Sequence, residues 1–454
     1  MSASALASIW RALGGAPGSL ARARSTSAGS LPSAFAVTDL ATASIAAAGL
    51  AVAELVEARH GQRPGVTVDR RLASSWFHGS IRPQGWRMPP AWDPVAGDYQ
   101  AADGWIRLHT NAPRHRDAAL AVLGVAAERG LVAQAVGAWR ADVLEDAVVQ
   151  RGGCAAAMRS LAAWGAHPQG QAIAAEPLVL HEPGGAGPAL AWTAPPDRPL
   201  HGVRVLDLTR VLAGPVATRF LAGFGAEVLR IDPPGWEEPG VVPEMTLGKR
   251  CARLDLRRQP GRATLESLLA GADVLVHGYR PGGLAALGLG AERRRALCPA
   301  LVDVSLDAYG WSGPWRGRRG FDSLVQMSSG IAEAGMARMG RDRPTPLPVQ
   351  ALDHATGYIM AAAAVRGLAG RLATGSGCTA RASLARTAAL LAGLPPGDPA
   401  PLAPEAPEDV AEPLEATAWG LARRVKVPLE VAGAPMRWDL PATALGSAAA
   451  AWAA

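Results

Sequence analysis

The feature that most constrains the fold is an alternation of short apolar runs with helical segments, which begins at Val203. The run VRVLDL predicts a buried strand and is followed by a turn, a short helix from Pro215 to about Phe224 and a second strand, EVLRI. Further runs, DVLVHGY from Asp273 and ALVDVSL from Ala300, are separated by segments rich in Leu, Arg and Glu. Strands that alternate with helices in this way indicate a parallel sheet covered by helices on both faces, so the sequence predicts an α/β, Rossmann-like fold.

The loops that follow these strands are the predicted ligand-binding positions. In open parallel sheets, ligands bind where the strands end and the loops begin. Predicted loops follow Leu208, Ile231, Val276 and Leu306. We therefore expect a binding site at this edge of the sheet.

A long helix is predicted from Leu352, with its N-terminus at or just after Asp353. Pro348 precedes this segment and Gly375 closes it. A carboxylate at a helix N-terminus is stabilised by exposed N–H groups and the helix dipole, so Asp353 is expected to be ionised near neutral pH. From the residues alone, the alternative role for Asp353 is a helix cap that contributes about 1 kcal/mol.

The same pattern occurs near the start of the chain. Residues 39–48 read DLATASIAAA and residues 353–362 read DHATGYIMAA, which agree at six of ten positions. The agreement continues with small length shifts and indicates an internal repeat of about forty residues, with coincidence between two Ala-rich helices as the alternative. Asp39 takes the place of Asp353 in the N-terminal copy and is interpreted as a structural cap or a relic.

Five regions are predicted along the chain. The segment DPVAGDYQAADGWIRLHTN predicts a hairpin and is followed by predicted helices, which is typical of a smaller α+β domain. Pro-rich stretches mark two boundaries. The regions are a flexible N-terminus at 1–30, the N-terminal copy of the Asp-led helix at 31–92, the small α+β domain at 93–190, the large domain at 198–394, and a Pro-rich linker with a closing segment at 395–454.

The composition favours a globular protein with a sizeable core, because 49% of the 454 residues are apolar and 19% are charged. The net charge of +6 is spread thinly, so nucleic acid is not an expected partner. No membrane-spanning run is expected, and the Arg-containing start of the chain is either a disordered N-terminus or an organelle transit peptide. No metal site, no disulfide framework and a cytoplasmic location are expected from the spacing of Cys154, Cys251, Cys298 and Cys378.

Five sequence blocks occur in a fixed order over roughly residues 200–391. They are LHGVRVLDLTRVLAGPVATRFLAGFGAEVLRIDPPG, TLGKRCARLDLR, ADVLVHGYRPGGLAALGLG, CPALVDVSLDAYGWSGPWRGRRGFDSLVQMSSGI and the helix at Asp353. Together they resemble the family III CoA-transferases, also called the CaiB/BaiF family. In the family's common order the small domain follows the catalytic helix, whereas here a helix copy and a small domain come first, so the chain resembles a permuted or partly duplicated member. The resemblance implies an interlocked homodimer.

The resemblance also implies a reaction, the transfer of coenzyme A (CoA) from an acyl-CoA to a small carboxylic acid, with CoA as a substrate and no tightly bound cofactor. It assigns Asp353 as the nucleophile that attacks the thioester carbonyl and carries the activated group covalently. Lys249 and Arg280 are expected to bind phosphate, and Tyr279 is expected to flank the adenine. The CoA-binding residues that the resemblance implies are Leu212, Ala213, Thr246, Leu247, Gly248, Lys249, Gly278, Tyr279, Arg280, Asp307, Ala308, Tyr309 and Gly310.

The chain departs from the formyl-transferring members of the family at several positions. Where those members carry arginine or glutamine, this chain has Pro233, Ala286 and Leu212, so a more apolar acyl group is expected. Two other functions stay open. An α-methylacyl-CoA racemase would need a histidine where this chain has Phe321, and phenylalanine does not exchange a proton. The third alternative is a non-catalytic CoA-binding subunit.

Overall fold

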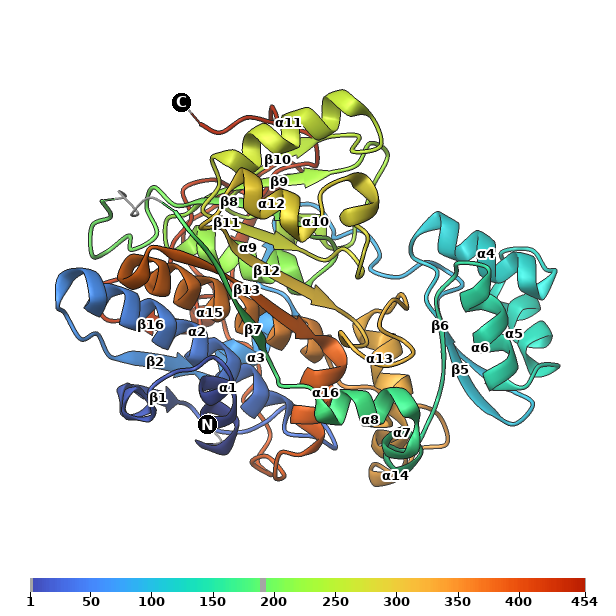
Figure 1. Cartoon of the computed structure of the whole chain (residues 1–454). Helices are drawn as coiled ribbons and strands as arrows, with labels where there is room; N and C mark the ends of the chain where they lie inside the picture. Colours follow the sequence, from blue (N-terminus) through green and yellow to red (C-terminus); the bar gives the residue numbers. More distant parts are fainter. Residues whose placement is uncertain (1–2, 188–192, 454) are drawn as a thin grey trace.

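The computed structural model describes residues 3–187 and 193–453 and is built around a seven-stranded sheet (Figure 1). The strand order is β10-β9-β8-β11-β12-β13-β7, and every neighbouring pair is parallel except β13 and β7. The predicted parallel α/β sheet is therefore confirmed. The strands are β7 (Leu180–Ala186), β8 (Arg204–Leu208), β9 (Glu227–Asp232), β10 (Lys249–Arg253), β11 (Val274–His277), β12 (Val302–Asp307) and β13 (Ser376–Ser383).

Helices cover both faces of this sheet, which explains why its strands are apolar without alternation. Val205 and Val274 face a core that includes residues of α9 and α15, whereas Leu206 and Leu275 face a second core that includes Leu265 of α11. These helices leave the carboxyl ends of the parallel strands uncovered, and the candidate site lies there. The helices around the sheet are α9 (Ala213–Gly223), α11 (Gln259–Ala270), α12 (Ala291–Leu297), α15 (Ala351–Thr374) and α16 (Leu384–Ala392).

Two long helices, α2 (Val37–His60) and α15, pack against each other in the centre of the molecule. Each has 24 residues and ends at a glycine with left-handed backbone, Gly61 (φ 69°) or Gly375 (φ 72°). A strand and a helix follow each one: β2 (Val66–Asp69) and α3 (Arg70–His78) after α2, and β13 and α16 after α15. In the described part of the chain, α2 alone is long and apolar enough to cross a membrane, and most of its apolar stretch is buried inside the protein.

A smaller α+β unit stands to one side of the large sheet (Figure 1). The chain leaves it after β6 and returns along the large sheet's side through α7, α8 and β7, so residues 161–186 of the predicted domain 93–190 lie outside this unit. The small unit has its own core. Its elements are β4 (Gly97–Ala101), β5 (Gly104–Leu108), α4 (Pro113–Leu123), α5 (Arg129–Gly137), α6 (Ala141–Gln150) and β6 (Ala155–Ala157), followed by α7 (Leu161–Ala166) and α8 (Pro168–Ala175).

The start of the chain is folded, which corrects the prediction of a flexible segment at 1–30. Residues 3–26 form α1 (Ala3–Ala12), a 3-10 helix (Pro17–Arg22) and β1 (Ala23–Thr26). In α1 the apolar residues recur at helical spacing, and Ile9 and Trp10 are buried in the same core as α2. This amphipathic spacing explains why the start of the chain folds against the core.

Two three-stranded sheets complete the structure, one with the order β1-β2-β16 and the other with the order β14-β15-β3. Both combine strands from the two ends of the chain. Their further strands are β3 (Ile81–Pro83), β14 (Glu415–Thr417), β15 (Gly420–Arg424) and β16 (Leu429–Val431), and the remaining helices are α10 (Val242–Met245), α13 (Asp322–Ser328), α14 (Ile331–Arg338) and the 3-10 turns Ala285–Leu287 and Pro407–Asp409.

Candidate active site

A cavity of about 500 Å³ opens at the carboxyl ends of β8, β11 and β12, at the edge of the sheet where ligands are expected. Asp353, the third residue of α15, lies in its wall. Residues 318–321 form another part of the wall, and Arg114 and His115 of α4 line it from the small unit. The cavity is therefore built from both units of the protein.

The Asp353 carboxyl group is buried in this wall. The residue is 7% exposed, and no hydrogen bond reaches its carboxyl oxygens from the described residues. Its backbone N–H donates instead to Oδ2 of Asp322 at 2.9 Å, and Asp322 also accepts a hydrogen bond from Gln326. Asp322 therefore occupies the N-terminus of α15, while the Asp353 side chain is left unbonded at the cavity.

The two carboxyl groups have raised pKa values. Burial, followed by the negative charge of Asp322, raises the pKa of Asp353 well above its ordinary value. Burial also raises the pKa of Asp322 to about 6, although hydrogen bonds from the start of α15 oppose this shift. The expectation that the helix N-terminus keeps Asp353 ionised is therefore wrong, because the Asp322 carboxyl group takes the N–H groups that would stabilise it.

Positive charge gathers on the other walls of the cavity. Arg318 forms an ion pair with Glu145 at 2.8 Å. By contrast, no ion pair with an acid within the described ranges is found for the other four lining arginines, at positions 114, 210, 280 and 319. Burial, and then the charge of Arg319, lowers the pKa of both Arg114 and Arg280. The cavity is thus suited to an anionic ligand.

Two further buried polar groups face the same cavity without a full set of partners. His115 is 2% exposed and its Nδ1 has no hydrogen-bond partner, while burial and the nearby Arg114 lower its pKa to about 4. Oδ1 of Asp307 accepts the N–H of Gly310 at 2.7 Å, but Oδ2 of Asp307 is unbonded. Buried polar atoms are rarely left unpaired, so these atoms indicate a polar ligand in the cavity.

Comparison with known proteins identifies the large domain. The profile described as CoA-transferase family III matches residues 200–410. Over this stretch, slightly less than half of the chain, the sequence is similar to CoA-transferase family III. The cavity at Asp353 lies at the ends of strands that this matched region supplies.

Several curated relatives are similar to part of the chain. A probable fatty acyl-CoA transferase of Mycobacterium tuberculosis is 34% identical over 190 residues, which cover 39% of this chain and 48% of the relative. The succinyl-CoA:glutarate CoA-transferase of Mus musculus is 35% identical over 211 residues, with 42% and 48% covered. The chain thus spans about half the length of these relatives. A crystal structure of the mycobacterial protein matches with 30% identity, 42% and 57% coverage and a TM-score of 0.39.

The structure brings together some of the family III contacts predicted from the sequence. The predicted contacts that line the cavity lie at the carboxyl ends of three neighbouring strands, β8, β11 and β12, or directly after them. Leu212 immediately precedes α9 but does not line the cavity, Tyr309 is buried with its hydroxyl bonded to Ser328, and Gly310 bonds Asp307. The lining residues among those predicted are Ala213, Gly278, Tyr279, Arg280, Asp307 and Ala308.

The predicted contacts at residues 246–249 lie away from the cavity. The Lys249 ammonium group has no exposed surface and donates to Asp207 and to the carbonyl of Pro215, both at 3.0 Å. Thr246 and Gly248 bond the carbonyl oxygens of residues 443 and 440 in the C-terminal segment. Leu247 is buried and is not among the lining residues. This corrects the expectation that Lys249 binds phosphate: Lys249, at the start of β10, neutralises the buried Asp207 of β8.

Sequence reasoning missed Asp322, Arg114, His115 and Arg319. Asp322 and Arg319 lie in the recognised block CPALVDVSLDAYGWSGPWRGRRGFDSLVQMSSGI, where the run of arginines was a usable signal. Arg114 and His115 come from the small unit, far away in the sequence, and no local pattern places them at the site. The arginines also supply charge near Ala286, which lines the same cavity.

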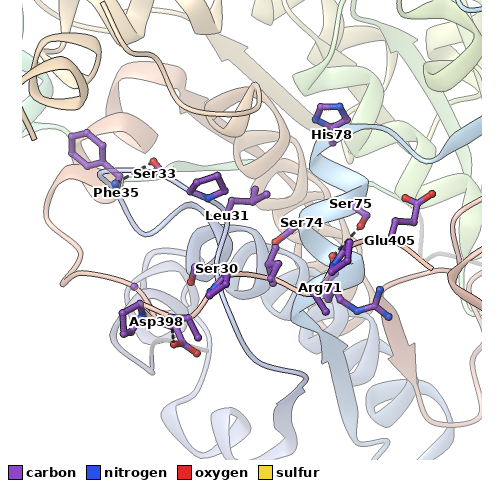
Figure 2. Close-up of a pocket in the computed structure, with 18 of the residues that line it drawn as sticks. Ser30, Leu31, Ser33, Phe35, Arg71, Ser74, Ser75, His78, Asp398 and Glu405 are labelled. Atoms are coloured by element: carbon purple, nitrogen blue, oxygen red, sulfur yellow. Dashed lines mark hydrogen bonds between the residues drawn. The ribbon is translucent and has the colours of Figure 1, made fainter. Parts of the chain in front are cut away.

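A second cavity, of about 700 Å³, lies between α3 and two loops (Figure 2). Its arginines, Arg71 and Arg82, are paired with Asp409 and Glu405 respectively. Asp398 accepts hydrogen bonds from two backbone N–H groups. Its charged side chains already have partners, so the smaller cavity at Asp353 is the better candidate for chemistry.

Proposed function

We propose that the protein transfers CoA from an acyl-CoA to a free carboxylic acid through a covalent intermediate on Asp353. The observation that carries the proposal is the unbonded Asp353 carboxyl group, buried in the wall of a cavity lined by arginines. The family III match of residues 200–410 supports the reaction class. Two of the relatives, a probable fatty acyl-CoA transferase from Mycobacterium tuberculosis and the succinyl-CoA:glutarate CoA-transferase of Mus musculus, have names that describe the same reaction class.

The reaction begins with attack of the ionised Asp353 carboxylate on the thioester carbonyl. The C–S bond breaks, CoA leaves as a thiolate, and a mixed anhydride forms. The thiolate then attacks the aspartyl carbonyl, which releases the donor acid as a carboxylate and leaves an aspartyl thioester. An acceptor carboxylate repeats the two steps in reverse, so a new acyl-CoA leaves and Asp353 is restored. No net proton, electron or water is consumed.

The surroundings of Asp353 fit a nucleophile. A carboxylate without hydrogen bonds in a buried site is poorly solvated, which makes it more reactive once it loses its proton. The arginines at positions 114, 280 and 319 provide cations for CoA phosphates or for the substrate carboxylates. Exclusion of water from the cavity protects the anhydride and the thioester from hydrolysis.

The racemase alternative receives less support from the site. Phe321 lines the cavity and stacks on His109, with ring centroids 3.7 Å apart and planes 5° from parallel. It leaves no exchangeable proton at that position. His115 lines the same cavity, but its lowered pKa makes it a weak base. The pair of proton-transfer groups that racemisation requires is therefore incomplete.

The proposal is tested by trapping the intermediate. Wild type, Asp353→Asn and the surface control Asp342→Asn are incubated with a panel of radiolabelled acyl-CoA donors and hydroxylamine, and the peptide that contains residue 353 is analysed by mass spectrometry. We expect a hydroxamate on Asp353 in the wild type and the control, and no hydroxamate at residue 353 in Asp353→Asn. Transfer activity in Asp353→Asn would contradict the mechanism. Solvent deuterium at the carbon next to the thioester would indicate racemisation, and CoA binding without either signal would indicate a binding subunit.

A further inference from the structure

The two ends of the chain share an order of elements, with further elements inserted in each, and the similarity extends beyond the two long helices. The shared N-terminal order is β1, α2, β2, α3, the hairpin β4–β5 and β7; β3 is inserted before the hairpin, and α4, α5, α6, β6, α7 and α8 are inserted after it. The shared C-terminal order is β12, α15, β13, α16, the hairpin β14–β15 and β16; α13 and α14 are inserted before α15, and a 3-10 turn is inserted before the hairpin. We call these the N-copy and the C-copy.

The pairing of strands is also the same in both copies. In the N-copy, β2 has β1 as a parallel neighbour and β16 as an antiparallel neighbour. In the C-copy, β13 has β12 as a parallel neighbour and β7 as an antiparallel neighbour. Each copy thus sends its last strand to the sheet of the other copy. Such a reciprocal exchange is the arrangement of two interlocked subunits, but here it occurs within one chain.

The two copies differ in the elements that accompany the shared order. In the N-copy the helices α4, α5 and α6 and the strand β6 of the small unit follow the hairpin, and α7 and α8 come before β7. In the C-copy β16 is the next element after the hairpin, and β8, β9, β10 and β11 precede β12. The hairpins match, because each is closed by two residues, Ala102–Asp103 or Ala418–Trp419. The cavity at Asp353 is lined both from the small unit of the N-copy and from the strands of the C-copy.

The counterpart of the active-site aspartate, Asp39, is closed off. Its Oδ1 is 2.8 Å from a guanidinium nitrogen of Arg70, the first residue of α3. The first residue of α16 is Leu384, which lines the cavity at Asp353. A Cβ built on Gly397 would lie 3.2 Å from Oδ2 of Asp39, so the linker passes directly over this carboxylate.

The N-copy also lacks the acidic neighbour. The segment that joins β12 to α15, residues 308–350, contains α13 and Asp322, whereas residues 27–36 join β1 to α2 and contain no helix. Asp39 is therefore paired with a cation, and Asp353 is placed beside an acid. The same position of the repeat has opposite electrostatic surroundings.

We propose that the chain is a fused pair of copies with one working site, in which the large domain of the C-copy and the small unit of the N-copy form the site at Asp353, while the site at Asp39 is closed. This proposal rests on the proposed function only where activity is the readout. It replaces the expected homodimer: the partner that completes the site lies in the same chain. One CoA is bound per chain, and Asp39 is not needed for turnover.

A mixing experiment distinguishes a site within one chain from a site shared between chains. Asp353→Asn inactivates the large domain, and Arg114→Glu inactivates the small unit's contribution to the cavity. We expect the co-expressed variants to stay inactive together. Sites shared between two chains would restore up to about a quarter of the wild-type activity, because half of the random pairs would contain one intact site of two. Such restoration would overturn the proposal.

The role of Asp39 is tested with a variant that leaves no unpaired buried charge. In Asp39→Asn/Arg70→Leu the ion pair is replaced by neutral side chains, and Leu is the residue that the C-copy has at this place. We expect kcat to stay within about twofold of the wild type. A loss as large as that of Asp353→Asn in a folded protein, measured by circular dichroism, would overturn the closed-site assignment.

Two readouts are independent of catalysis. Titration calorimetry with CoA is expected to give one site per chain, and light scattering is expected to give the mass of a single chain, 46.7 kDa. Two CoA sites per chain, or a stable dimer, would overturn the fused-pair proposal even if transfer is observed. If no acyl-CoA donor supports transfer while the mass and the Asp39 result hold, the proposed function fails and the fused pair stands.

Discussion

Replacing Asp322 with asparagine is expected to stabilise the protein, by an amount that depends on pH. Burial raises the pKa of Asp322 from 3.8 to about 6. A pKa unit corresponds to about 1.4 kcal/mol, so keeping this carboxylate ionised in the folded state costs up to about 3 kcal/mol. Asparagine removes this cost, and its side-chain oxygen still accepts the N–H of Asp353.

The sign follows from the protons bound by each state. Between about pH 4 and pH 6, the folded protein holds a proton on Asp322 that the unfolded chain has released, so wild-type stability falls as pH rises through this window. The variant does not titrate at this position. The free energy of unfolding of Asp322→Asn, relative to the wild type, should therefore increase from near zero at about pH 4 to about 2–3 kcal/mol at pH 7.

Urea unfolding followed by circular dichroism at several pH values between about 4.5 and 7.5 measures this difference. Asp342→Asn, at an exposed position, is the matched control and should show no trend with pH. The acid limb of the transfer activity should also move to lower pH, because loss of the neighbouring charge lowers the pKa of Asp353. A stability difference that shrinks or becomes negative as pH rises would show that Asp322 is stabilised as a carboxylate and would refute this reasoning.

Three more outcomes are expected. Arg319→Gln should raise KM for acyl-CoA about tenfold with little change in kcat, because one charge-assisted contact is lost, and the rise in KM should be smaller at high salt. Steady-state kinetics, with Arg341→Gln as the control, test this, and an unchanged KM would contradict it. Lys249→Met should lower the free energy of unfolding by about 3–5 kcal/mol, because Asp207 is left buried and unpaired; urea unfolding measures it, and a stable variant with lost CoA affinity would restore Lys249 as a phosphate contact. CoA at about 100 times its Kd should stabilise the protein by about 2.7 kcal/mol; no shift of the unfolding midpoint would contradict CoA binding.

The sequence was sufficient to predict the sheet and a long helix at Asp353, although this helix begins at Ala351 and not at or after Asp353. The runs from Val203 onward are apolar on both faces, and only a parallel sheet covered on both sides buries such strands. The carboxyl ends of such strands lie at one edge, which explains why residues from separate loops, such as Gly278 and Asp307, line one cavity. These features were predictable because they follow from a local, periodic pattern of apolar residues.

Other features of the site depend on contacts between distant segments. The run TLGKRC does not show that Lys249 points into the sheet toward Asp207, because a lysine beside a glycine is equally typical of an exposed loop. The ionisation of Asp353 was predicted from its helix alone, whereas burial, and then the charge of Asp322 from another helix, raises the pKa of Asp353. Arg114 reaches the cavity only through the packing of the small unit. Local spacing carries no information on such contacts.

The charged groups around the cavity act as one set. The arginines without an acidic partner in the described part of the chain repel one another, and no arginine contributes to the raised pKa of Asp353, which burial and the charge of Asp322 cause. An anionic ligand that contacts the arginines relieves their repulsion, and it requires no displacement of an existing ion pair. Asp39 shows the opposite solution, since Arg70 neutralises it within the fold. Asp39, which has its own counter-ion, is suited to a structural role. Asp353, at the same position of the repeat, lies among acids and arginines without counter-ions and is suited to binding an anion and reacting with it.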